Sequence, residues 1–152
     1  MPICPWEPAQ YLFFSSNVPP LLYYSHGISV VFVLVFGFLL LPKVRQNLSV
    51  KLLLILIALF SAWVLLDLHI WATNNPSSVL FFWSVLILIE LLIYISAIYF
   101  IDVFNTKQDV SFYKKLLMFL ITLPVIVTLP TNFNLSGIDL SYCIALEGFV
   151  AK

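Results

Sequence analysis

Three ionisable residues, Asp67, His69 and Glu90, lie inside long apolar stretches of the sequence. Ionisable groups in a membrane are costly, and they usually face the interior of a helical bundle or a ligand pathway. His26 has a similar setting in an earlier stretch, whereas Asp102 lies at the edge of one and is expected to be solvated. If these stretches are helices that cross a membrane, the side chains of Asp67, His69, Glu90 and His26 all lie in the same half of the membrane.

Aromatic residues recur on the same helical faces as the two acids. Trp63 and Trp71 lie four residues before and four residues after Asp67. Trp83 lies seven residues before Glu90, and Tyr94 lies four residues after it. Residues at such spacings share one side of a helix. The candidate ligand-binding residues are Asp67, Glu90, Trp63, Trp71, Trp83 and Tyr94. One interpretation is an acidic pocket with an aromatic rim, open to the outside. The other is hydrogen bonding between helices, or a carboxyl group kept neutral by desolvation.

Glu90 carries the most specific expectation. It falls near the middle of an apolar segment, where a charged group facing lipid is penalised by at least about 2.5–3.5 kcal/mol. We therefore expect Glu90 to face the bundle interior in a neutral form, with Ser29 or Ser61 as a hydrogen-bond partner.

Other chemistry is sparse. Cys4 and Cys143 are the only cysteines, and either a disulfide between them or two unpaired thiols fits the sequence. A metal site would need His26, His69 and Asp67 to converge, and no metal or cofactor is expected. The sequence contains no catalytic triad signature, phosphate-binding loop or zinc-protease motif, so we do not expect an enzyme.

The composition explains which elements must position these residues. Of 152 residues, 62% are hydrophobic and only 9% are charged, against about 25% in soluble domains. The mean hydropathy of +1.08 excludes disorder as well as a soluble surface. A membrane-spanning helix needs about 20 apolar residues. The sequence therefore predicts an all-α transmembrane bundle, with an arm over 1–20, a tail over 131–152, and four spans between them at about 21–41, 52–72, 79–104 and 112–129.

Basic residues set the orientation of such a bundle, because they favour the cytoplasmic side. Six of the seven lie in the first and third connections: Lys43, Arg45, Lys51, Lys107, Lys114 and Lys115. We expect these connections in the cytoplasm, and the N-terminus and the tail outside. Seven basic residues balance seven acidic ones, so nucleic acid is not an expected partner.

Four ordered landmarks carry a family resemblance: CPWEPAQYLFFSSNVPPLLYYSH, WVLLDLHIWATNNP, FFWSVLILIELLIYISAIYF and LPTNFNLSGIDLSYCIALEGFVAK. Together they resemble the N-terminal seven-transmembrane region of some bacterial sensor histidine kinases. The resemblance covers about the first four of seven spans and no catalytic motif, so the chain is expected to be a fragment without the kinase core. It implies the bacterial cytoplasmic membrane, a homodimer, and an unknown small-molecule or lipid-like signal. It transfers no site residue.

The leading functional hypothesis is accordingly a membrane-embedded sensor region that passes helix displacements to a cytoplasmic output. The alternatives are a small transporter, in which Asp67 and Glu90 would bind a cation or proton, and a structural subunit of a membrane complex.

Overall fold

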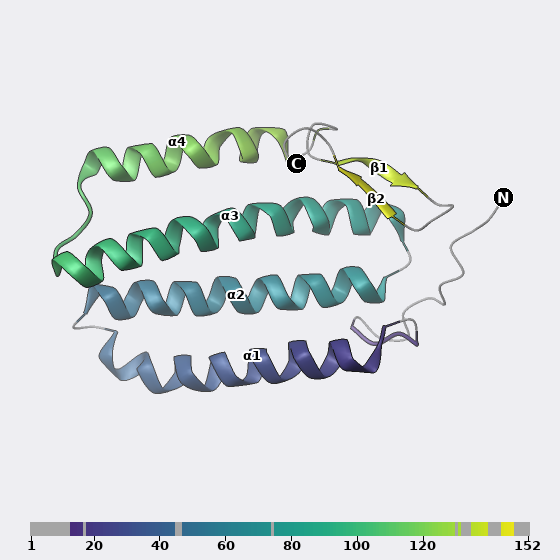
Figure 1. Ribbon diagram of the computed structural model, residues 1–152, viewed down its shortest axis with the longest axis horizontal. Helices are drawn as coiled ribbons and strands as arrows, with labels where there is room; N and C mark the ends of the chain where they lie inside the picture. The colour runs from purple at the N-terminus through teal and green to yellow at the C-terminus, as the bar shows by residue number, and fades with distance from the viewer. Residues whose placement is uncertain are drawn as a thin grey trace.

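The computed structural model describes residues 13–16, 18–44, 47–73, 75–129, 131, 135–139 and 144–147. Four helices make up most of this part of the chain (Figure 1). They are α1 (Pro20–Leu40), α2 (Leu48–Ala72), α3 (Pro76–Thr106) and α4 (Phe112–Thr128), and a short 3-10 turn, η1 (Leu41–Lys43), follows α1. A two-stranded hairpin follows α4, with β1 over Leu135–Asp139 and β2 over Ile144–Glu147.

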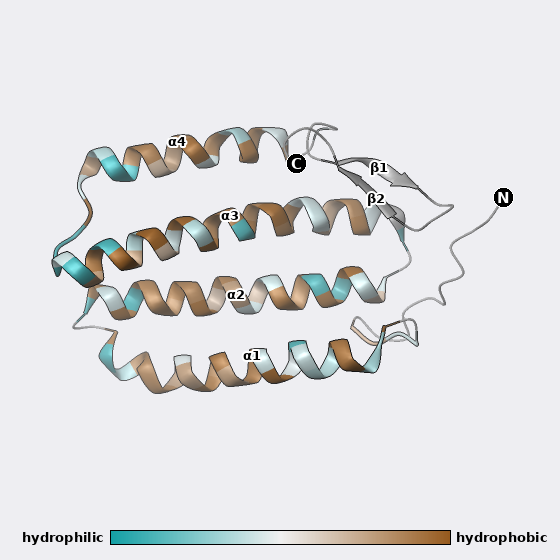
Figure 2. Ribbon diagram, viewed as in Figure 1, coloured by the Kyte–Doolittle hydropathy of each residue, from teal (hydrophilic) through white to brown (hydrophobic). Residues whose placement is uncertain are grey.

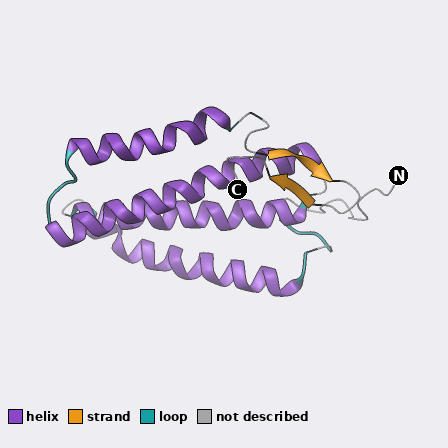
Figure 3. Ribbon diagram, turned by 45° about the horizontal axis from the view of Figure 1, so that its top comes forward, coloured by secondary structure: helices purple, strands orange, loops and turns teal. Residues whose placement is uncertain are grey.

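The helices lie side by side in one row in chain order. The packed pairs are α1 with α2, α2 with α3, and α3 with α4, and both views show this order (Figures 1 and 3). Each helix therefore packs against its chain neighbours. A single row leaves two broad faces uncovered by the described part of the chain, unlike a bundle of two layers.

The row has two distinct ends. The α1–α2 and α3–α4 connections lie at one end, and the α2–α3 turn and the hairpin lie at the other (Figure 1). The first, called here the basic end, carries Lys43, Lys51, Lys107, Lys114 and Lys115. The second is called the hairpin end. The gathering of described lysines at one end is the pattern expected of a protein whose spans alternate in direction.

Local sequence signals explain where the helices begin and end. The Asn47 side chain accepts a hydrogen bond from Ser49 N, and the Asn75 side chain accepts from Ser77 N and Ser78 N, so both cap helix starts. Pro20 and Pro76 occupy first helical positions, where no N–H is required. Lys107 has a positive φ of 56° and ends α3 in the left-handed conformation.

Three helical segments are long and apolar enough to cross a membrane: Pro20–Lys43, Leu48–Ala72 and Ser77–Thr106. Brown apolar residues run along nearly the whole length of these helices in Figure 2. Few residues of these segments are buried by protein, and α1 in particular exposes most of its large apolar side chains, as lipid contact would require. These observations are compatible with a multi-pass membrane protein. The expected fourth span corresponds to α4, which has 17 residues and a length of about 26 Å, shorter than a bilayer core of about 30 Å.

The expected tail is partly β-structure, which the all-α prediction did not include. Strands β1 and β2 are antiparallel, pairing Ile138 with Ala145 and Asp139 with Ile144, and β1 contacts α3. Strands of five and four residues give too little alternation of apolar and polar residues to be identified from sequence. The arm is described only near α1, where Ser15 N donates to Tyr23 Oη at 2.9 Å.

Gly37 sets the register between α1 and α2. A methyl group in its place would come within 3.2 Å of Ile57 Cγ2 and 3.5 Å of Leu54 Cδ2, so the absence of a side chain allows the helices to approach closely. Eleven residues before Gly37 stands His26, and ten residues after Ile57 stands Asp67. At 1.5 Å per residue in antiparallel helices, these two positions lie about 16 and 15 Å from the contact, and therefore opposite each other.

Candidate functional site

The most prominent polar contact between helices at the hairpin end joins His26 of α1 to Asp67 of α2. His26 Nε2 lies 2.9 Å from Asp67 Oδ2. The side chains are 15% and 21% exposed, so both are largely desolvated. His26 is six residues after the start of α1, and Asp67 is five residues before the end of α2, or about 9 and 8 Å from those ends.

The second ring nitrogen of His26 is also engaged. Nδ1 lies 3.0 Å from the Leu22 carbonyl oxygen and 3.1 Å from Ser25 Oγ. With a proton on each nitrogen, the ring donates to the Leu22 carbonyl and to the Asp67 carboxylate, and the contact is an ion pair. With a proton on Nε2 alone, the ring still donates to Asp67, and Nδ1 accepts from Ser25. The helix contact therefore changes character when His26 gains or loses a proton.

His69 lies on another side of α2, among aromatic rings. Its ring meets Phe13 edge-on at a centroid distance of 6.1 Å and Phe82 edge-on at 4.7 Å. His69 and Asp67 are separated by about 200° around the helix, so the two side chains contact different neighbours. The described residues contain no group of three potential metal ligands, so His26, His69 and Asp67 do not converge there.

The six candidate ligand-binding residues fall into separate settings. Asp67 faces α1 through its contact with His26. Trp63 and Trp83 pack between α2 and α3 against the cluster of Ile70, Val79 and Leu86. Asp67 therefore contacts α1, whereas the two tryptophans contact the cluster between α2 and α3.

The other three candidates are exposed. Trp71 is exposed near the end of α2, and Glu90 and Tyr94 are exposed on α3. Helical spacing identified which residues share a face, but it did not reveal which neighbour each face meets. A role of these residues in ligand binding stays a prediction.

The expectation for Glu90 is wrong in its direction. Glu90 does not face the interior of the helix row; it is exposed, and Tyr94 Oη of the same helix donates to its Oε1 at 3.2 Å. Ser29 donates to the Ser25 carbonyl oxygen instead, at 2.7 Å. Ser61 is buried, but its Oγ makes no hydrogen bond with any described residue. The prediction assumed that Glu90 points toward a neighbouring helix, whereas the Glu90 side chain lies on the exposed surface of α3.

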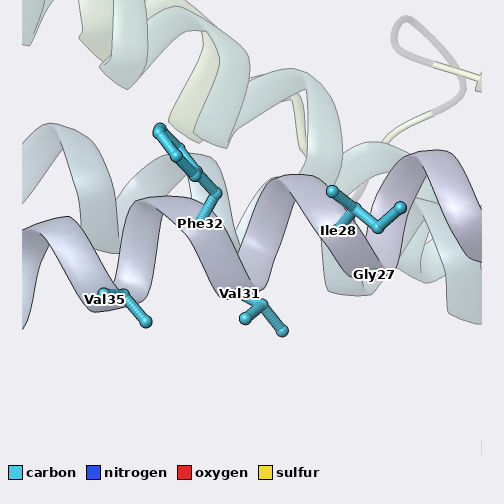
Figure 4. A pocket seen from close by; sticks show the side chains of 5 residues that line it. All are labelled: Gly27, Ile28, Val31, Phe32 and Val35. Carbon is cyan, nitrogen blue, oxygen red and sulfur yellow. The ribbon is translucent and has the colours of Figure 1, made fainter.

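An apolar hollow lies on α1, away from these polar groups. Its lining residues are Gly27, Ile28, Val31, Phe32 and Val35, and it measures about 370 Å³ (Figure 4). Figure 4 shows Ile28 and Phe32 on one side of the helix and Val31 and Val35 on the other. A hollow with an almost wholly apolar lining and wide access to the surroundings suits contact with hydrocarbon rather than recognition of a polar ligand.

Charged contacts at the basic end are more numerous and more exposed. Lys114 Nζ lies 2.8 Å from Asp102 Oδ2. Asp109, in the α3–α4 connection, accepts from Lys115 and Tyr99, at 2.5 Å each. The hydrogen bond from Lys115, followed by that from Tyr99, lowers the pKa of the Asp109 carboxyl below its ordinary value of 3.8.

His26 is the residue whose importance the sequence did not reveal. The sequence presents it as one histidine in an apolar helix, and its partner lies 41 positions away. The short connection between α1 and α2 does indicate that these two helices are antiparallel. The register also depends on Gly37, however, and that contact is a property of the packed pair. Cys4 and Cys143, the expected disulfide pair, lie outside the described residues.

Comparison with known proteins found no matching family model, no matching curated protein and no matching solved structure.

Proposed function

We propose that this chain is the membrane-embedded signal-input region of a bacterial sensor histidine kinase, located in the cytoplasmic membrane with its N-terminus outside. One observation carries the proposal. The His26–Asp67 contact joins α1 to α2 near the hairpin end, while the described lysines gather at the opposite end. A contact that depends on protonation or on a competing ligand, placed on the outer side, is a suitable input for a signal that must reach the cytoplasm.

The chemistry of the pair supports this role. Both side chains are mostly desolvated, so their mutual attraction is screened less than that of exposed charges. A signal molecule with a hydrogen-bond donor or a cationic group would compete with His26 for the Asp67 carboxylate. Losing the His26 contact would leave α1 held to α2 mainly by apolar packing, and the two helices would be freer to shift. Helix shifts of about 1–2 Å are a common means of signal transmission.

A transporter receives less support from this geometry. It would use Asp67 and Glu90 along one pathway, but Asp67 faces α1 and Glu90 is exposed on α3. Among the described residues, no hydrogen-bonded chain joins the two carboxyl groups.

Topology is the first test. Single cysteines at Asn47 and Gln108, in a background with Cys4 and Cys143 replaced, should be protected from an impermeant thiol reagent added outside intact cells. A cysteine at Asn75 should be labelled. Outside labelling at Asn47 or Gln108 would contradict the proposed orientation.

The sensor role is tested in the protein as its genome encodes it. The reading frame should continue through further spans into a helix with a phosphorylatable histidine and an ATP-binding domain. In membrane vesicles, Asp67→Asn should change the rate of autophosphorylation, because it removes the carboxylate that His26 contacts. Lys114→Met at the basic end is the matched control and should change it little. A reading frame without a phosphoacceptor histidine would refute the assignment.

A further inference from the structure

Three of the five described lysines at the basic end have an electrostatic partner. Lys114 and Lys115 each form an ion pair with an aspartate, so both described aspartates of this end are engaged. The Lys107 ammonium lies 4.2 Å from the centroid of the Phe104 ring, which is a cation–π contact. Any further positive charge at this end therefore has to be balanced by something other than a described acidic side chain.

Lys43 and Lys51 are the two lysines without such a partner. Both are exposed, and within the described ranges neither side chain forms an ion pair or a cation–π contact. The sequence offers no nearby acid in this region, because no aspartate or glutamate occurs between Glu7 and Asp67. The two positive charges therefore have no counterion on α1 or on the part of α2 that precedes Asp67.

The register of the two helices places these charges opposite each other. Lys43 follows Gly37 by six residues, and Lys51 precedes Ile57 by six residues. Both lysines therefore lie about 9 Å from the close contact of Gly37 with Ile57, in the direction of the basic end. The α1–α2 connection closes this end of the helix pair (Figure 1). Two like charges at one level repel each other, and an anion held between them replaces that repulsion by attraction.

Both lysines also lie at the boundary of the membrane-length segments. The segment Pro20–Lys43 ends at the first lysine, and Lys51 is the fourth residue of Leu48–Ala72. Leu41, two residues before the end of the first segment, is 52% exposed. An exposed apolar surface that ends in two ammonium groups matches the shape and polarity of a phospholipid, because acyl chains lie beside the apolar residues and the phosphate lies at the level of the headgroups.

We propose that Lys43 and Lys51 together bind the headgroup phosphate of an anionic phospholipid at the basic end of the α1–α2 pair. Each ammonium donates to a phosphate oxygen, and the flexible lysine stems allow both to reach one group between the helices. A lipid with a net negative charge is favoured, because a zwitterionic headgroup brings its own cation to the two lysines. Basic residues between membrane-spanning helices recognise anionic headgroups in this way.

The inference requires α1 and α2 to cross a membrane and does not require a role in signalling, so its failure would leave the sensor proposal standing. The test titrates the full chain in detergent micelles with phosphatidylglycerol, and native mass spectrometry gives the dissociation constant of the first bound lipid. Phosphatidylcholine with the same acyl chains is the matched lipid. Phosphatidylglycerol should bind at least about fivefold more tightly, the contribution of one lysine near an anionic lipid.

Variants of equal charge separate the lysine pair from a general attraction. Lys43→Met and Lys51→Met should each weaken the binding of phosphatidylglycerol about fivefold. Lys51→Arg keeps the charge and should retain most of the affinity. Lys114→Met is the matched control, because it removes the same charge from the same end but from a lysine that already contacts Asp102, and it should change the affinity little.

Equal affinities for the two lipids would overturn the inference. An effect of Lys114→Met as large as that of Lys51→Met would overturn it too, because net charge and not the opposed pair would then explain the binding. An excess of glycerol 3-phosphate should leave the lipid bound. Displacement by this soluble phosphate would refute the assignment of the site to a membrane lipid.

Discussion

The two ends of the helix row hold their helices together with different electrostatic contacts. At the hairpin end, His26 and Asp67 meet with side-chain exposures of 15% and 21%. At the basic end, Lys114 and Asp102 meet with exposures of 59% and 27%, and a second exposed lysine–aspartate pair lies beside them. The distances are nearly equal, at 2.9 and 2.8 Å, so solvent exposure and not geometry distinguishes the two ends.

This difference indicates what each end can do. Exposed ion pairs contribute little because water and salt screen them and long side chains lose entropy. In the proposed topology, their lysines instead orient the chain in the membrane. The His26–Asp67 contact is desolvated, so removing one partner leaves the other without compensation. A change in a single group can therefore alter helix packing at the hairpin end but hardly at the basic end.

Breaking the His26–Asp67 contact should have the largest effect. Asp67→Leu or His26→Leu should lower the free energy of unfolding by about 2 kcal/mol, because each leaves a desolvated hydrogen-bonding group unpaired. The double variant should cost clearly less than the sum of the two, because neither partner is then left behind. Unfolding in mixed micelles measures all three. Additive single effects would show that the residues are not coupled.

Separating α1 from α2 at their closest approach tests whether the register maintains that contact. Gly37→Leu should lower the free energy of unfolding by about 1 kcal/mol. Overpacking costs about 2 kcal/mol, and the better helix propensity of leucine offsets about 0.8 kcal/mol of that cost. Gly27→Leu is the control: a Cβ there meets nothing within 4 Å, so this variant should be at least as stable as the wild type. Equal effects of the two changes would argue against close packing at Gly37.

The exposed pair at the basic end should matter less. Lys114→Met should change the free energy of unfolding by under about 1 kcal/mol, and raising salt to about 1 M should remove most of that difference. The effect of Asp67→Leu should persist at the same salt concentration. Comparable salt sensitivity at the two ends would contradict the contrast between them.

The smallest expected effect is a local titration in the α3–α4 connection. Hydrogen bonds from Lys115 and Tyr99 lower the pKa of Asp109, so their stabilising contribution is present above its ordinary value of 3.8 and is lost as the pH falls through the lower folded-state value. Val110 N donates to Asp109 Oδ1, so the Val110 amide resonance should report the midpoint below 3.8. Lys115→Met should move that midpoint upward.

Particular residues show how far the sequence could lead. The predicted second and third spans began at 52 and 79, whereas α2 and α3 begin at Leu48 and Pro76, directly after the capping residues Asn47 and Asn75. Capping and the missing proline N–H act within a few residues, so these starts could have been identified from the sequence. Asp67 could be selected because its cost inside an apolar helix depends only on its own chemistry. The direction of Glu90 could not be predicted in the same way. Helical spacing fixes which residues share a face but not whether another helix covers that face.

The sequence by itself therefore determined the helical character, three of the membrane-length segments and the clustering of basic residues in alternate connections. Each of these follows from composition and from interactions over a few positions. Only the tertiary structure decided that the helices form a single row, that His26 meets Asp67, that Trp63 and Trp83 pack against the same cluster between α2 and α3, and that Glu90 stays outside the row. The physical reason is that these outcomes depend on contacts such as Gly37 with Ile57, in which close approach of two distant segments sets the register for every residue beyond it.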